Sequence, residues 1–325
     1  MQMELHGGRK AHIANILEPC YDVASRGKTG KTTKESARIV MTRKENTENT
    51  YIIDTESGAE TARLINQDHC MNEAMGDLFP ESVNLDTVVD VLDVACGPGG
   101  WAEEVAYLYP HLKVVGIDIS RAMIEFAKQR AQVQFLDNTS FRVMNARSPL
   151  AFPDGAFDLV NARFMAAFLP REEWPGVVKE FARLTRPGGT IVLTEVDNFS
   201  QGHTNSPALE ELNALCREAL YLAGLYSGTG TWVTSMLDQF LQEAGCQNIQ
   251  NKWHTLDFSA GTSAYQAVFS NLRFALKLVQ PFLLKMVKTT QERLDELYET
   301  GLQEMMLDTF HGQTDFLTVW GIRGE

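Results

Sequence analysis

The sequence predicts an α/β fold whose sheet is largely parallel and covered by helices on both faces. In residues 91–102 an apolar run stops at a cluster of glycines and an amphipathic segment begins at once, which is typical of a strand, a tight turn and a helix. Further apolar runs follow, and the segments between them are long enough for one helix each. Strands and helices that alternate in this way form doubly wound sheets.

The glycine cluster predicts a site for a nucleotide-like cofactor. Gly97 and Gly99 have no Cβ atom, so they can adopt unusual backbone angles and let a ligand lie against the main chain. The helix that follows directs free N–H groups at a negative group. The spacing of Gly97, Gly99 and Ala102, with Asp118 closing the next apolar run, also satisfies the dinucleotide fingerprint. NAD(P) and S-adenosylmethionine therefore compete as cofactors.

Asp93 allows a choice between these two cofactors, because its carboxylate stands within the strand that precedes the glycines. A carboxylate at this place would repel a pyrophosphate and attract the ammonium group of an amino acid. Asp93 therefore favours S-adenosylmethionine.

Four further segments stand in the order and near the spacing found in class I S-adenosylmethionine-dependent methyltransferases. They are residues 114–120, 143–146, 152–160 and 186–193. With the glycine turn they extend over about 82–258, and the sequence resembles this family, in particular the ubiquinone and menaquinone biosynthesis-like enzymes and the small-molecule methyltransferases of secondary metabolism. The resemblance implies a Rossmann-like, doubly wound sheet of seven strands whose last strand is antiparallel.

The resemblance also implies the residues that bind the cofactor. Asp93 would serve its amino end, Asp118 would accept the ribose hydroxyls, and Asn145 would meet adenine where the family usually has an acidic or amide residue. Arg163 is expected either to contact cofactor or substrate or to form a surface salt bridge. The expected cofactor set is Asp93, Ala95, Gly97, Gly99, Asp118, Ile119, Met123, Asn145, Ala146, Ala162 and Arg163.

Methyl transfer needs an attacking lone pair in line with the methyl–sulfur bond in a water-poor cavity, and help from an acid or base is optional. If the acceptor requires a base, the candidates are His203, Glu195, Asp197 and His311. Glu195 and Asp197 could equally cap a helix or face solvent. Phe164 and Glu195 are expected to contact the substrate, and no set of histidines and carboxylates has the spacing of metal ligands.

The chain is expected to comprise five segments: a basic arm (1–50), a cap helix (51–81), the cofactor-binding core (82–260), a helical insertion (261–313) and the last strand (314–325). Residues 1–48 hold nine basic and six acidic residues, a net charge of +3. A short apolar stripe in this arm makes a homodimer plausible. Polar residues of the cap helix could face solvent or line a pocket; they are Arg63, Gln67, Asp68 and His69.

Three interpretations of the insertion remain open. Its wide apolar run could pack in the core, form a lid over an apolar or aromatic acceptor, or attach to a membrane surface through Lys277, Lys285 and Lys288. No segment is expected to span a membrane, because the most apolar stretch, 272–287, is interrupted by charged residues and proline.

The net charge and the cysteine content limit the kinds of partner and the cellular compartment that we expect. A formal net charge of −13 argues against a large nucleic-acid footprint, which needs a basic face. Five scattered cysteines without a C-x-x-C pair favour a reducing cytoplasm over a disulfide framework. The expected activity is methyl transfer from S-adenosylmethionine to a small organic acceptor. The alternatives are a protein that binds S-adenosylmethionine without transfer and, with less support, a nicotinamide-dependent oxidoreductase.

Overall fold

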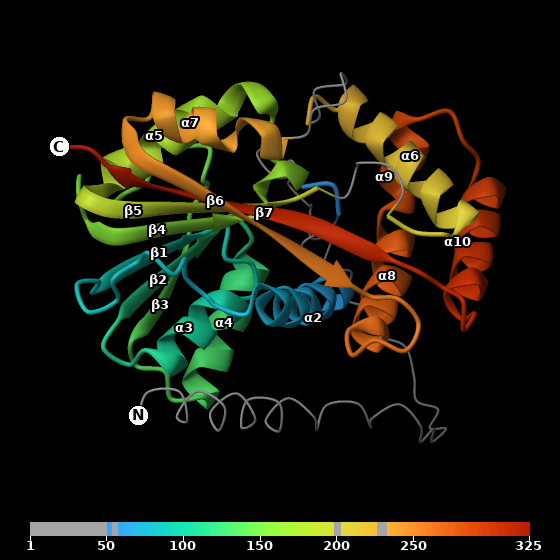
Figure 1. Ribbon diagram of the computed structural model, residues 1–325, viewed down its shortest axis with the longest axis horizontal. Coiled ribbons are helices and arrows are strands. Elements are labelled where there is room, and N and C mark those ends of the chain that lie inside the picture. The colour runs from blue at the N-terminus through green and yellow to red at the C-terminus, as the bar shows by residue number, and fades with distance from the viewer. Residues whose placement is uncertain (1–50, 54–57, 198–202, 226–232) are drawn as a thin grey trace, which may run out of the picture. The chain divides into compact units, whose positions relative to one another are not determined.

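The computed structural model describes residues 51–53, 58–197, 203–225 and 233–325 (Figure 1). The chain divides into two units, Met1–Thr47 and Glu48–Glu325, and the described residues all belong to the second unit. The basic arm, its apolar stripe and the homodimer that we inferred from that stripe lie outside the described residues.

The second unit is built on one seven-stranded sheet with the order β3-β2-β1-β4-β5-β7-β6. The strands are β1 (Asp90–Val94), β2 (Lys113–Asp118), β3 (Thr139–Val143), β4 (Phe157–Arg163), β5 (Thr185–Val196), β6 (Cys246–Asp257) and β7 (Gln313–Arg323). Strand β7 pairs antiparallel with both β5 and β6, while the pairs among β1 to β5 are parallel. The predicted fold class is therefore confirmed.

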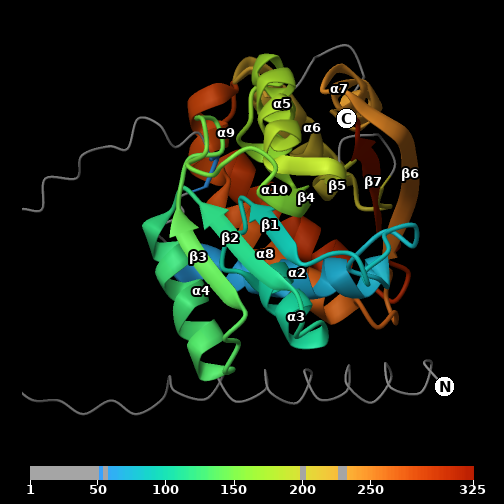
Figure 2. The same ribbon diagram turned by 90° about the vertical axis from the view of Figure 1, so that its left-hand side faces the viewer.

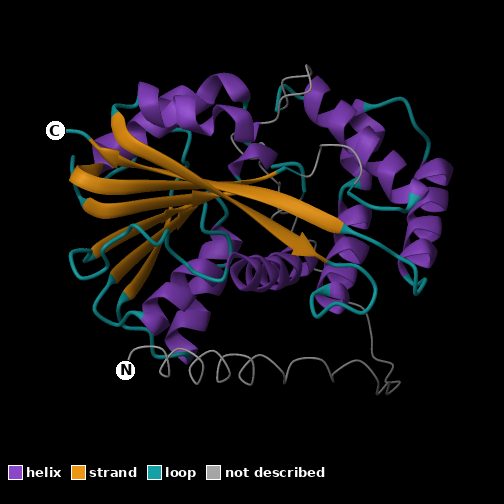
Figure 3. Ribbon diagram, viewed as in Figure 1, coloured by secondary structure: helices purple, strands orange, loops and turns teal. Residues whose placement is uncertain are grey.

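Helices cover both faces of the sheet, with α5 and α7 on one face and α3 and α4 on the other (Figures 1 and 3). The helices are α2 (Gly58–Met75), α3 (Gly100–Leu108), α4 (Arg121–Val133), α5 (Trp174–Leu184), α6 (Pro207–Leu222), α7 (Leu237–Glu243), α8 (Tyr265–Leu278), α9 (Gln280–Met286) and α10 (Gln291–Met305). Successive residues of β1 show why both faces are covered. Val91 packs in the cluster that holds α3 and α4, whereas Leu92 packs with α5 and α7, because neighbouring strand residues point to opposite faces.

A separate group of helices lies beyond the end of the sheet and is seen on the right of Figure 1. It consists of α6 and the three helices of the insertion, α8, α9 and α10, which share a second apolar cluster that also includes Phe316 of β7. Figure 2 shows α2 running beneath the open end of the sheet, between α3 and α8. Helices α2, α6, α8 and α9 form walls of a cavity.

No single described helix has the length and the apolar character needed to cross a membrane. Helices α8 and α9 taken together would be long and apolar enough, but they meet at a bend of 42°.

Candidate cofactor and acceptor site

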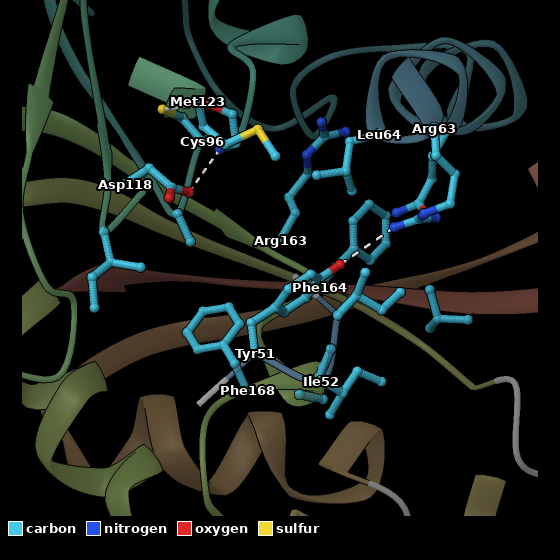
Figure 4. Close-up of a pocket in the computed structure, with 18 of the residues that line it drawn as sticks. Tyr51, Ile52, Arg63, Leu64, Cys96, Asp118, Met123, Arg163, Phe164 and Phe168 are labelled. Atoms are coloured by element: carbon cyan, nitrogen blue, oxygen red, sulfur yellow. Dashed lines mark hydrogen bonds between the residues drawn. The ribbon is translucent and has the colours of Figure 1, made fainter. Parts of the chain in front are cut away.

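A cavity of about 370 Å³ opens at the carboxyl ends of β1, β2 and β4, which is where parallel α/β sheets bind ligands. Helices α2, α6, α8 and α9 complete its walls. Figure 4 shows Asp118 and Arg63 on opposite sides of the cavity, with Arg163 and Phe164 between them. Most of the residues predicted from the sequence line it: Asp93, Ala95, Gly97, Asp118, Ile119, Met123, Asn145, Ala146, Arg163, Phe164 and Glu195.

The glycine turn and Asp118 form one hydrogen-bonded unit. Gly97 has a φ angle of +52°, and a Cβ atom added there would meet only Leu64 at 3.9 Å, so the backbone is open to the cavity. Its N–H donates to Asp118 Oδ2 (3.0 Å), and the N–H of Ser120 donates to Oδ1 (2.8 Å). Each carboxylate oxygen keeps a further acceptor site, so Asp118 is held in place yet able to accept two hydroxyl groups.

Gly99 and Ala162, two of the predicted cofactor contacts, do not line the cavity. Gly99 has a φ angle of +86°, and an added Cβ would lie 2.9 Å from Ala127 Cβ and 3.0 Å from the ring of Phe141. This glycine therefore lets α4 and β3 pack closely against the turn rather than clearing space for a ligand. Ala162 is 2% exposed and lies in the apolar cluster that holds α5 and α7.

Asp93 places a carboxylate at the cavity wall with only 3% of the residue exposed. Asn161 Nδ2 donates to Asp93 Oδ1 at 2.8 Å. Burial raises the pKa of Asp93 to about 7, although nearby Arg163 and the Asn161 hydrogen bond favour the ionised form. A bound cation would add to these favourable interactions and promote ionisation.

Arg163 joins the end of β4 to α2, which is more than the surface salt bridge we considered. Its guanidinium pairs with Asp68 at 3.0 Å and donates to Asn72 Oδ1 at 2.7 Å. Asp68 also lies against the start of α3, since a Cβ added to Gly100 would be 2.5 Å from Asp68 Oδ2. Arg163 thus lines the cavity and belongs to a buried ion pair at the same time.

A second polar network connects α2 to the insertion. Arg63 donates twice to Glu60, both bonds at 2.7 Å, and to Gln67 Oε1 at 2.6 Å. It also donates to the hydroxyl of Tyr51 and to Asn271 Oδ1 of α8, both at 3.3 Å. All five guanidinium donors are used, and Glu60 neutralises the charge. Of the cap-helix residues whose place the sequence left open, Arg63, Gln67 and Asp68 line the cavity, whereas His69 is exposed and does not.

Glu195 is the one proposed base that lines the cavity, and it is engaged with the main chain. Its carboxylate accepts from the N–H groups of Met165 (2.6 Å) and Ala166 (3.3 Å). These residues belong to the short 3-10 helix η2 (Met165–Ala167) that follows Phe164. Burial raises the pKa of Glu195 to about 8. Glu195 therefore fixes the loop that carries Phe164, and its carboxylate is not a free base.

The other three base candidates do not line the cavity. Asp197 follows the end of β5, and its N–H donates to the carbonyl of Asp315. The backbone carbonyl of His203 accepts from Gln313, and His311 Nδ1 lies 2.8 Å from Ser259 Oγ at the surface. Within the described ranges, no group of three or more histidine, cysteine or acidic side chains could hold a metal ion.

The half of the cavity away from Asp118 is mostly apolar, and sequence analysis missed much of it. Its apolar lining comes from Leu64, Met71, Phe164, Phe168, Leu220, Leu276, Val279 and Phe282. Polar contributions come from Gln67, Asn213 and Cys216. The apolar run of the insertion signalled Leu276, Val279 and Phe282, but nothing in the sequence distinguished the cavity-facing residues of α6 from its core residues.

Residues 91–189 match the methyltransferase domain family. The chain contains a methyltransferase domain. The match covers the glycine turn, Asp118, Asn145 and Arg163, and it confirms the resemblance inferred from the sequence.

Curated relatives agree with this assignment. Nocamycin O-methyltransferase from Saccharothrix syringae is 42% identical over 110 residues, which are 33% of this chain and 37% of the relative. Demethylmenaquinone methyltransferase from Lactococcus lactis is 33% identical over 125 residues, 38% of this chain and 45% of the relative. The matched part thus spans less than half the length of either relative. Among solved structures, YcgJ from Bacillus subtilis is 20% identical with a TM-score of 0.47, covering 73% of this chain and 93% of that one.

Proposed function

We propose that this chain transfers a methyl group from S-adenosylmethionine to a small, apolar or aromatic organic acceptor by in-line displacement. The observation that carries the proposal is the convergence of Asp93, Gly97, Asp118 and Asn145 on one cavity inside the matched methyltransferase domain. These residues lie at or just past the ends of three parallel strands, and only the fold brings them together.

The cavity suits S-adenosylmethionine because its lining offers a suitable group to each part of this cofactor. Gly97 leaves the main chain open, Asp118 presents two oriented oxygens, and Ile119 and Met123 offer apolar contacts for a flat ring. Asp93 and Arg163 provide opposite charges for an amino-acid end. When bound, S-adenosylmethionine supplies a methyl group activated by a positively charged sulfur.

The chain's own residues orient the acceptor and exclude water. The apolar half of the cavity, between α2, α6, α8 and α9, would hold the acceptor body, and the hydrogen bonds of Glu195 would keep Phe164 in place beside it. An acceptor that is already nucleophilic needs no general base, which suits a cavity where Glu195 is tied to the main chain. In this proposal the insertion acts as a lid.

We further propose a reducing, cytoplasmic setting and a small molecule rather than a nucleic acid as the acceptor. The described cysteines, Cys70, Cys96, Cys216 and Cys246, are free, and the net charge of −13 opposes binding to a polyanion.

Incubation with radiolabelled S-adenosylmethionine and a panel of phenols, quinols and carboxylic acids with large apolar bodies tests the proposal. Labelled product is expected with some of these acceptors and not with polar acceptors of similar size. Ala275→Trp, which fills the apolar half, should abolish transfer while leaving the affinity for S-adenosylhomocysteine unchanged. Cofactor binding without product across the panel would indicate a binding protein instead.

A further inference from the structure

The outer face of helices α8 and α9 carries a basic and apolar surface that the cavity does not use. Between Asp257 and Glu292 the chain has four basic residues and no acidic one, although its total net charge is −13. The exposed residues of this surface, which we name the basic lid face, are Arg273, Phe274, Pro281, Leu284, Lys285 and Lys288.

The basic lid face and the cavity lie on opposite sides of the same helices. Ala275 and Leu276 of α8, and Val279 directly after this helix, line the cavity. At 100° per residue these positions lie on the side opposite to Arg273 and Phe274. In α9 Phe282 lines the cavity while Pro281 and Leu284 are exposed. One thin layer of helix therefore separates the apolar half of the cavity from this surface.

Charge and exposed apolar groups occur together on the basic lid face. Phe274 is 48% exposed and Leu284 is 39% exposed, large values for such side chains in a packed domain. Within the described residues, Arg273, Lys285 and Lys288 form no ion pair with an acidic side chain. Lys277, which at 100° per residue falls between Arg273 and Phe274 on α8, is paired with Asp295 of α10 at 2.6 Å, so the acidic helix α10 lies beside this face.

We propose that the basic lid face docks on an anionic lipid bilayer, lying in the headgroup region without crossing the membrane. Unpaired cations beside Phe, Pro and Leu are the chemistry of interfacial helices, and anionic lipids supply the opposite charge. The arm (residues 1–48) has a net charge of +3, so it is not charge-complementary to this face. Docking there would bring the acceptor half of the cavity next to the membrane.

Flotation of the purified full-length chain with vesicles tests this inference without cofactor or acceptor. Binding is expected to vesicles of phosphatidylcholine mixed with phosphatidylglycerol and to be much weaker with phosphatidylcholine alone or at high salt. Because no methyl transfer is measured, failure here leaves the proposed function intact, and an inactive enzyme could still bind vesicles.

Two sets of variants make the test specific. Combined Arg273→Glu, Lys285→Glu and Lys288→Glu should lower vesicle partitioning at least about tenfold, and Phe274→Ser with Leu284→Ser should lower it further. The matched control, Lys113→Glu with Arg171→Glu and Lys179→Glu, changes the net charge equally at exposed positions outside α8 and α9 and should retain binding. Thermal unfolding verifies that each variant is folded.

Equal loss in the control set, or equal binding to neutral and anionic vesicles, would overturn the inference. So would absence of vesicle binding together with retention on immobilised polyglutamate through the same three cations, because the partner would then be an acidic polypeptide. A change of oligomeric state in the triple variant alone, without vesicle binding by the parent, would assign the face to a second copy.

Discussion

At the scale of single residues, the two glycines of the turn, Gly97 and Gly99, both have positive φ angles but differ in their surroundings. Gly97 faces the cavity, whereas Gly99 touches Ala127 and Phe141. We expect Gly99→Ala to lower the free energy of unfolding by about 2–4 kcal/mol, because backbone strain and overpacking add. Urea denaturation measures the effect.

Gly245 is the matched control for this substitution. Its φ angle is +88°, and an added Cβ would meet nothing within 4 Å. Gly245→Ala should therefore lower the free energy of unfolding through backbone strain alone, by about 1 kcal/mol. Equal losses for the two variants would show that the packing contact at Gly99 is unimportant.

Asp93 leads to a prediction about pH. Its pKa is raised to about 7 by burial, and a bound cation favours the ionised carboxylate. The affinity for S-adenosylmethionine should thus increase as the pH rises through about 7 and then level off. Asp93→Asn should weaken binding and flatten this dependence, whereas Asp158→Asn, which changes a carboxylate at the other end of the sheet, should leave the pH dependence as it is. Calorimetric titration at several pH values checks this, and an unchanged profile in Asp93→Asn would contradict it.

At the scale of elements, α2 and α8, which both line the cavity, are joined by side-chain hydrogen bonds. Asn66 Nδ2 donates to the carbonyl of Ala267 at 2.7 Å, and Asn271 Nδ2 donates to the carbonyl of Arg63 at 3.2 Å. The double variant Asn66→Ala with Asn271→Ala loses both bonds and the acceptor of Arg63 at Asn271 Oδ1. It should lower the free energy of unfolding by about 1–3 kcal/mol. It should also raise the KM for the acceptor several-fold with little change in the affinity for S-adenosylhomocysteine, because only the acceptor half loses its support.

Asn138→Ala is the control for that pair of substitutions. Asn138 also donates to two main-chain carbonyls, those of Ala106 (3.1 Å) and Leu112 (2.9 Å), but it lies away from the cavity lining. A similar loss of stability with an unchanged acceptor KM is expected. If the KM rises equally in both variants, global destabilisation rather than the α2 to α8 connection explains the effect.

The elements also show what could be predicted from the sequence. The cofactor half was predictable because Asp93, Gly97 and Asp118 lie in contiguous motifs whose local structure follows from the pattern. The acceptor half was predictable only in part. The apolar run of the insertion indicated Phe282, whereas Asn213 lines the same cavity only because α6 packs against the insertion. Asp197 and His203, two of the base candidates, do not line the cavity, because proximity to a strand end along the chain does not fix the direction of a side chain.

At the scale of the whole molecule, several buried carboxylates make stability depend on pH. The pKa is raised by burial to about 7 for Asp93 and Glu103 and to about 8 for Glu195. For an acid whose pKa is raised by folding, the folded state binds the proton more tightly. The contribution of such an acid to the free energy of unfolding is therefore complete below the ordinary carboxyl pKa near 4. It is lost as the pH rises to about 7–8.

The cofactor-free protein should accordingly be less stable at about pH 8.5 than at about pH 6, by roughly 4–6 kcal/mol. Glu180, whose pKa is lowered by its hydrogen bonds with Arg183, loses its contribution only at lower pH and does not change this result. Urea midpoints at the two pH values measure the difference, and Glu195→Gln should reduce it. A midpoint that increases with pH would show that these carboxylates are ionised at little cost.

The most direct test of the central claim is calorimetric titration of the protein with S-adenosylhomocysteine and, separately, with NADH. We expect micromolar binding of the first and none of the second. Binding should be lost in Asp118→Ala and retained in Asp197→Ala, which alters a carboxylate outside the cavity lining. Binding of NADH alone, or of neither compound, would contradict the assignment of this cavity to S-adenosylmethionine.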